Sequence, residues 1–165
     1  MNQSRTDTRP PSTDSGEKAT LLAFLNYQRD SIVAKAEGIS DEQGRTRGVP
    51  SGTSVLGLIR HLSAAERLWF AEVFSGGPEI GETDLDMEIR PDETADGLIA
   101  AYREAISQAN EIIAACNDMD QPSARLARGD TRSMRWILLH MIGETSRHAG
   151  HADILREQID GAVGR

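Results

Sequence analysis

The chain has 165 residues, of which 38% are hydrophobic and 27% charged, a composition typical of one folded globular domain rather than a disordered chain. The formal net charge of -8 argues against wholesale binding of nucleic acid, which requires a basic surface to neutralise phosphates. Cys116 is the only cysteine, so an intrachain disulfide is excluded and a reducing cytoplasm is the expected location.

Residues 1–16 are polar and lack the apolar core of a signal peptide. No later stretch approaches the roughly 20 apolar residues that a membrane-spanning helix needs, so we expect no membrane association. The chain is therefore predicted to have a mobile polar N-terminal tail at residues 1–16, followed by one domain at residues 17–165.

The first predicted helix runs from Glu17 to about Glu37. Its apolar residues are mostly separated by three, four or seven positions, which is the spacing of one helical face. They are Leu21, Leu22, Leu25, Ile32 and Val33. Gly38 is expected to end this helix, and the sequence SDEQ at residues 40–43 predicts a capping box that opens a short helical turn.

The second predicted helix runs from about Ser54 to Phe74, and its apolar face has steps of three and four residues. This face consists of Val55, Leu58, Leu62, Ala65, Trp69 and Val73. The connection that follows, Glu79 to Asp92, is acidic and long. Its carboxylates alternate, but the glycine and the terminal glutamate of a calcium-binding loop are missing, so we expect a solvated loop.

Two further helices are predicted, from about Thr94 to Cys116 and from Ser133, as the cap, to about Ile159. The four amphipathic segments have no alternating, strand-like run of comparable strength beside them. The sequence therefore predicts an all-α fold, a four-helix bundle.

The last of these helices contains LLHMIGETSRHAGHADILRE, which includes three of the four histidines of the chain. At about 100° per residue, one stripe of this helix includes His140, Glu144, His148 and His151. His148 lies in the middle of the apolar face and Glu144 at its edge. A helix that points such groups toward a core must provide them with partners.

A divalent cation is one such partner, since Glu144 and His148 lie one turn apart and can bind the same ion. The third ligand is expected from His61, the only histidine outside the last helix. Three protein ligands with open positions are typical of a catalytic metal site. The alternative is that these residues are hydrogen-bonded core histidines, and His140, two turns from His148, is the one we expect to be structural.

Three arginines flank the histidine segments: Arg60, Arg147 and Arg156. They could hold a carboxylate or a sugar, but arginines beside a helix core usually stay solvated, and that is the prediction here.

At these residues the sequence resembles the DinB-like metalloprotein superfamily, and more closely its branch of mycothiol-dependent enzymes and uncharacterised bacterial proteins. The matching segments are PSGTSVLGLIRHLSAAERLWF and WILLHMIGETSRHAGHADILREQIDG. The resemblance implies a four-helix bundle with metal ligands at His61, Glu144 and His148. In many relatives the two ligands that lie four residues apart on the last helix are both histidines. In the maleylpyruvate isomerase of this branch the first of these two residues is glutamate, as it is here. His151 falls where many relatives have glutamine, which implies a residue of the pocket.

The isomerase carries a further C-terminal domain, and this chain ends at Arg165, so the resemblance does not extend to maleylpyruvate isomerisation. We expect a metal-dependent enzyme that uses a low-molecular-weight thiol of the mycothiol type on a small electrophile, by S-transfer or thiol-assisted isomerisation. Zinc is the expected ion, with nickel, iron or manganese as alternatives. A metal ion bound at this site would favour the thiolate, which is the nucleophilic form of the thiol.

His151 and Asp153 are candidate residues of the pocket or partners of the ligand histidines. A solvent-facing Asp153 that pairs with Arg156 or Arg147 is the alternative. Two other functions remain open at this stage. The same residues could bind metal in a non-enzymatic bundle or form a polar network at a homodimer interface, and Cys116 could act as a catalytic thiol, although no histidine lies near it in sequence.

Overall fold

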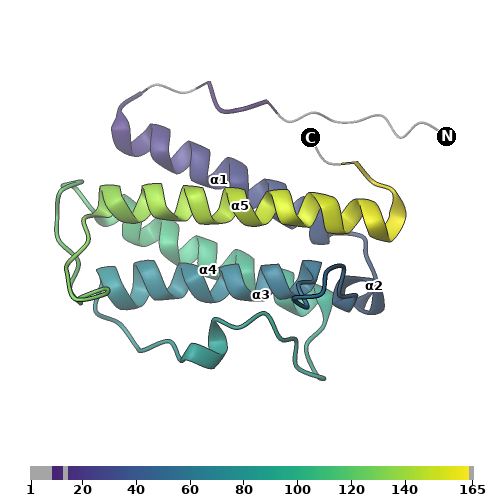
Figure 1. Ribbon diagram of the computed structural model, residues 1–165. Helices are drawn as coiled ribbons and strands as arrows, with labels where there is room; N and C mark the ends of the chain where they lie inside the picture. Colours follow the sequence, from purple (N-terminus) through teal and green to yellow (C-terminus); the bar gives the residue numbers. More distant parts are fainter. Residues whose placement is uncertain (1–8, 13–14, 164–165) are drawn as a thin grey trace.

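The computed structural model describes residues 9–12 and 15–163, and its long helices lie side by side as a bundle (Figure 1). The elements are α1 (Glu17–Ala36), α2 (Asp41–Arg45), α3 (Val55–Glu66), the π-helical continuation η1 (Arg67–Phe74), the 3-10 turn η2 (Glu82–Asp84), α4 (Ala95–Ala115) and α5 (Met134–Asp160). The predicted all-α four-helix bundle is confirmed. Within the described ranges, β-type pairing is limited to two isolated bridges.

Residues 1–8 and 13–14, which make up most of the predicted polar tail, lie outside the described residues. In the part of the chain that is described, no helix is both long and apolar enough to cross a membrane.

The helix ends follow from local capping chemistry. Ser40 and Gln43 form the predicted capping box, with the Gln43 backbone N–H donating to Ser40 Oγ at 3.2 Å and the Ser40 N–H to Gln43 Oε1 at 2.9 Å. Ser133 caps α5 by accepting from the Trp136 N–H, and Gly161 ends that helix in the left-handed conformation at φ 75°. The predicted helices therefore begin and end within one or two residues of the observed ones.

The helices run in two parallel pairs, α1 with α5 and α3 with α4 (Figure 1). The start of α1 meets the end of α4, where Lys18 Nζ donates to the Cys116 carbonyl at 2.8 Å. Toward the other end of α1, Glu37 pairs with Arg103 in the first half of α4. Because α3 and α4 are parallel, the connection between them must return along the whole length of α3.

The apolar faces predicted from sequence meet in the interior, where leucine, isoleucine and valine side chains are fully buried. One cluster packs near the α2 end of the bundle around Leu56, Ile59 and Tyr102, and the other packs around Phe70, Met134 and Ile137. Burial of each large apolar side chain contributes about 1.5–3 kcal/mol, which is what holds four amphipathic helices together.

A charged pair is buried between these apolar clusters. Arg29 of α1 and Glu66 of α3 are each 1% exposed, and the guanidinium donates from Nε to Oε1 at 2.8 Å and from Nη2 to Oε2 at 2.5 Å. Arg29 Nη1 also donates to Asn26 and to Asn110 of α4, both at 2.8 Å. Burial raises the pKa of Glu66, and the charge and hydrogen bonds of Arg29 oppose that rise. The pair thus joins three helices through one guanidinium.

Replacement of Arg29 with methionine should lower the free energy of unfolding by about 3–5 kcal/mol, because it leaves the Glu66 carboxylate buried without its cation. The double variant Arg29→Met/Glu66→Met should lose less than the sum of the two single losses, since neither charge is then left alone. Urea denaturation followed by circular dichroism measures all three values. Additive losses would contradict this account of the pair.

Candidate metal centre

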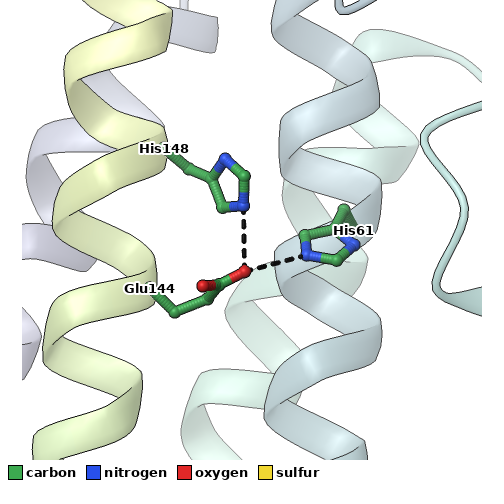
Figure 2. Close-up of side chains that lie close together, drawn as sticks. All are labelled: His61, Glu144 and His148. Carbon is green, nitrogen blue, oxygen red and sulfur yellow. Dashed lines mark hydrogen bonds and ion pairs between the residues drawn. The ribbon is translucent and has the colours of Figure 1, made fainter.

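Three side chains from two helices converge in the seam between α3 and α5. His61 of α3 and Glu144 and His148 of α5 point toward one another (Figure 2), and one ligand atom of each lies within 4.8 Å of the others. Glu144 Oε1 is 3.3 Å from His61 Nε2 and 3.0 Å from His148 Nε2. The structure therefore brings together the three residues singled out from sequence, although 83 positions separate the first from the second.

The spacing of these atoms fits a cation. Ligands bound about 2.1 Å from a tetrahedral zinc ion are about 3.4 Å apart, close to the two distances from Glu144 Oε1. Two imidazole nitrogens and one carboxylate oxygen form the mixed donor set of zinc sites that keep a position open. His148 Nδ1 is buried and has no hydrogen-bond partner among the described residues, so this ring is held through the contact of its Nε2 with Glu144.

The protonation states of the cluster also suit a cation. Burial lowers the pKa of His148 below its ordinary value, and the Glu144 charge only partly offsets this effect. Burial acts to raise the pKa of Glu144, but the contacts of the carboxylate with His61 and His148 outweigh burial, so the net shift is downward. At neutral pH the carboxylate is therefore ionised and the His148 ring is neutral, which are the forms that bind metal.

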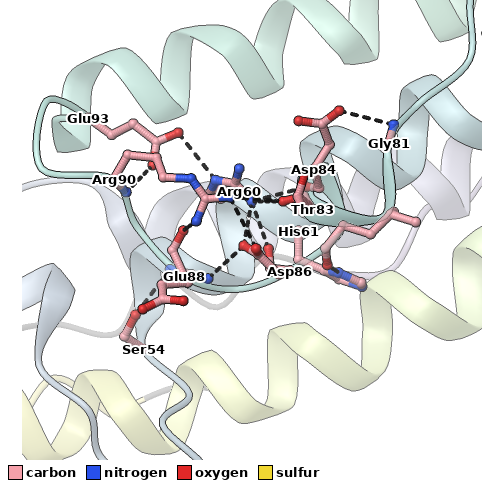
Figure 3. Close-up of polar contacts among 12 residues, drawn as sticks. Ser54, Arg60, His61, Gly81, Thr83, Asp84, Asp86, Glu88, Arg90 and Glu93 are labelled. Carbon is pink, nitrogen blue, oxygen red and sulfur yellow. Dashed lines mark hydrogen bonds and ion pairs between the residues drawn. The ribbon is translucent and has the colours of Figure 1, made fainter.

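The acidic connection has mostly exposed carboxylates, as the predicted solvated loop requires, but part of its backbone is also attached to α3. The Leu85 carbonyl lies 2.6 Å from His61 Nδ1, and Arg60 binds the same segment with a side chain that is only 11% exposed (Figure 3). The expectation that Arg60 stays solvated is therefore wrong. Arg60 meets this segment because the connection returns along α3, which residue types alone do not reveal.

A cavity of about 630 Å³ opens beside the cluster and shares His61 and Glu144 with it. Its walls are part apolar, with Trp69 and Leu139 among them, and part polar, with Arg128 and Arg147 as the remaining charged lining residues. Arg128 has a backbone φ of 54°, a strained conformation for a residue other than glycine and one enriched at functional sites. The sequence prediction missed Trp69 and Arg128, and only the positive φ, which a sequence does not show, distinguishes Arg128.

His140 lies in an aromatic stack and not among the three converging ligands, in agreement with the structural role expected for it. Its ring centroid is 4.6 Å from that of Trp69 and 5.0 Å from that of Trp136, and it is nearly parallel to the second. Burial lowers the pKa of His140, the Glu144 charge opposes that shift, and the arginines of the cavity reinforce it.

The two remaining candidates lie in different surroundings. His151 is exposed, and its ring lies edge-on to that of His148 with centroids 5.5 Å apart. Asp153 pairs with neither arginine considered for it but with Lys35 of α1, at 2.9 Å. Arg156 instead pairs with Asp160, and Arg147 lies 3.9 Å from Glu144 Oε2. Asp153 therefore links two helices, and only His151 contacts a member of the cluster.

Tryptophan fluorescence should report the titration of His140, since the two tryptophans of the chain both contact this ring and a protonated imidazole quenches them. Because the pKa of His140 is lowered, the neutral ring persists below pH 6.5, and the fluorescence should fall with a midpoint below that value. His140→Gln is the control and should remove the transition. A midpoint at or above pH 6.5 would contradict the burial of this ring.

Comparison with known proteins bears on the fold and the family of the chain. A solved structure described as a conserved protein from Enterococcus faecalis superposes with a TM-score of 0.60 and 15% sequence identity, over 88% of this chain and 98% of that chain. At this identity the likeness shows the fold alone. No curated protein matches the chain. Residues 20–161 match the DinB-like family described as mycothiol-S-transferase, in agreement with the resemblance seen in the sequence. The chain belongs to the mycothiol-S-transferase family.

Proposed function

We propose that this protein is a metal-dependent enzyme that transfers the sulfur of a low-molecular-weight thiol, such as mycothiol, to a small electrophile. The observation that carries the proposal is the convergence of His61, Glu144 and His148 beside a cavity, in a chain of the mycothiol-S-transferase family. We place the reaction in the cytoplasm, where such thiols are kept reduced.

The three side chains would hold a divalent ion through His61 Nε2, Glu144 Oε1 and His148 Nε2. Zinc fits this donor set, and nickel, iron and manganese accept the same ligands. When bound, the ion supplies a Lewis acid that favours the thiolate over the thiol at neutral pH. Three protein ligands leave room for a reactant, which is why we favour catalysis over a purely structural site.

The remaining steps concern residues of the chain. The cavity shares His61 and Glu144 with the cluster, so a reactant bound in the cavity would lie next to a thiol held at the cluster. The thiol would release its proton to solvent, its sulfur would form a bond to a carbon of the electrophile, and the leaving group would depart from that carbon with the bonding electron pair. His151 remains a candidate contact for a bound reactant because its exposed ring lies against His148. We assign Asp153 no part in the reaction, since it pairs with Lys35.

The lining of the cavity favours an electrophile with a flat apolar body and a carboxylate. Trp69 and Leu139 provide apolar surface, and the guanidinium groups of Arg128 and Arg147 provide two positive charges in a protein whose net charge is -8. A hydrogen bond between two charged groups contributes about 1.5–3 kcal/mol, roughly a ten-fold or greater effect on binding.

The metal ligands are tested by metal content after reconstitution with zinc and removal of excess ion. The wild type and His140→Ala should retain one zinc ion per chain, whereas His148→Ala should lose most of it, because two donors hold an ion much more weakly than three. A chelator should abolish thiol-dependent turnover but preserve the helical circular dichroism, since the apolar core does not depend on the ion. Equal zinc loss in both variants, or collapse of the fold on chelation, would argue against this catalytic site.

The substrate class is tested with two electrophiles of matched shape, 4-(bromomethyl)benzoate and the neutral 4-(bromomethyl)benzamide, each with mycothiol. Arg128→Gln and Arg147→Gln should lower kcat/KM for the benzoate about ten-fold and leave the benzamide almost unchanged. Arg103→Gln removes the same charge at a distant surface pair with Glu37 and should change neither value. Equal rates for both electrophiles in the wild type would rule out the carboxylate preference while leaving the thiol transfer intact.

A further inference from the structure

The crossover segment between η2 and α4 lies across the candidate metal centre and is fastened to α3 by one arginine. We propose that Arg60 is a positioning residue for this centre: it holds the segment so that the Leu85 carbonyl fixes the ring of His61 in the orientation and tautomer that binds metal. This inference rests on the proposed metal site and adds to it a residue that touches neither metal nor substrate.

The contacts of Arg60 with the segment are numerous and come from one side chain (Figure 3). Its Nη1 donates to the carbonyls of Thr83, Asp84 and Asp86 at 3.2, 3.1 and 2.9 Å, and to Asp86 Oδ1 at 2.8 Å. Its Nε donates to Glu93 Oε1 at 3.2 Å. The backbone of residues 83–86 therefore lies around one guanidinium nitrogen while Nε reaches Glu93, and the single ammonium nitrogen of a lysine could not supply both sets of contacts.

Two other features hold the segment in the same place. Arg90 Nη2 donates to the Thr83 carbonyl and to Asp86 Oδ2, both at 3.1 Å. Gly57 of α3 lies so close to the segment that a Cβ atom there would come within 2.5 Å of the Met87 carbonyl oxygen. The segment is therefore packed directly on the backbone of α3, one turn before His61.

Leu85 lies between two residues whose carbonyls bind Arg60, and the position of its own carbonyl determines which ring nitrogen of His61 carries the proton. Arg60 binds the carbonyls of Asp84 and Asp86, and the carbonyl between them, that of Leu85, lies 2.6 Å from His61 Nδ1. A carbonyl oxygen only accepts hydrogen bonds, so in a neutral ring the proton must be on Nδ1. The lone pair of Nε2 then faces Glu144 Oε1, 3.3 Å away, and a cation between these two acceptors would relieve their repulsion.

Loss of a group that binds the second ring nitrogen of a metal-binding histidine commonly changes metal affinity 10- to 100-fold, because that group orients the ring and fixes its tautomer. Loss of the Arg60 guanidinium leaves its backbone and carboxylate acceptors without that donor and releases the Leu85 carbonyl from its fixed place. The His61 ring can then rotate or place its proton on Nε2, where it blocks the metal. Arg60 therefore affects the centre through Leu85.

Arg60→Gln is compared with Arg156→Gln, which removes a matched side chain. Arg156 is 14% exposed and donates to two backbone carbonyls, those of Lys35 and Glu37, as well as to Asp160, but it lies two turns beyond His148. Gly57→Ala is a second, independent variant, because it keeps Arg60 and displaces the segment through Met87. Circular dichroism establishes that each variant is folded.

The first measurement uses the metal-free protein and the nitrogen NMR signals of its four histidines. His61 should be protonated on Nδ1 in the wild type and in Arg156→Gln, and should become a mixture of tautomers in Arg60→Gln and Gly57→Ala. The second measurement is zinc affinity by competition with a chelator. It should fall 10- to 100-fold in Arg60→Gln and in Gly57→Ala, and less than about three-fold in Arg156→Gln, with Arg60→Lys intermediate.

The two measurements separate this inference from the proposed function. If the wild type binds no zinc, the proposed function fails, and the tautomer of His61 in the metal-free protein still decides whether Arg60 positions that ring. If the wild type binds zinc but Arg60→Gln has the same affinity and the same tautomer, the role of Arg60 is overturned while the metal site stands. Equal effects of Arg60→Gln and Arg156→Gln would reduce Arg60 to a general contributor to stability.

Discussion

The ion pair of Arg29 and Glu66 sets the register on which the bundle depends. Apolar helix faces can slide past one another at little cost, whereas a buried carboxylate that loses its guanidinium costs several kcal/mol, so this pair selects one alignment of α3 against α1. On another face of α1, Lys35 pairs with Asp153 of α5. Because α3 and α5 both pair with α1, His61 of α3 and Glu144 of α5 lie at the same height along the bundle.

The parallel arrangement of α3 and α4 explains how the centre acquires its surroundings. An antiparallel neighbour would need only a short turn, but a parallel one needs a chain segment long enough to return along α3, about 30 Å for its 20 residues including η1. That segment passes over His61 and brings the Leu85 carbonyl to it. The topology thus provides a backbone acceptor for one ligand without any specialised side chain.

The sequence predicted the elements well and the contacts between them less well. Capping residues such as Ser40 and Ser133 are local signals, so the helix ends could be predicted, and the i to i+4 spacing of Glu144 and His148 indicated a shared site. The buried pair was missed, although Arg29 lies on the apolar face of its helix, a position that requires a partner. The contacts of Arg60 with residues 83–86 could not have been predicted, because the acceptors are mostly backbone carbonyls, which every residue type possesses.

The positions of the three converging donors also have a consequence for the order of folding. Glu144 and His148 are four residues apart and meet as soon as α5 is helical, an event of about a microsecond. His61 is 83 residues from Glu144 and joins them only when α3 docks, after a large loop has closed. If the proposed centre binds an ion, a nascent chain offers that ion only two weak ligands, and the third arrives with the finished tertiary structure. Loading with metal would then be a late step in the maturation of this protein, after the helices have packed.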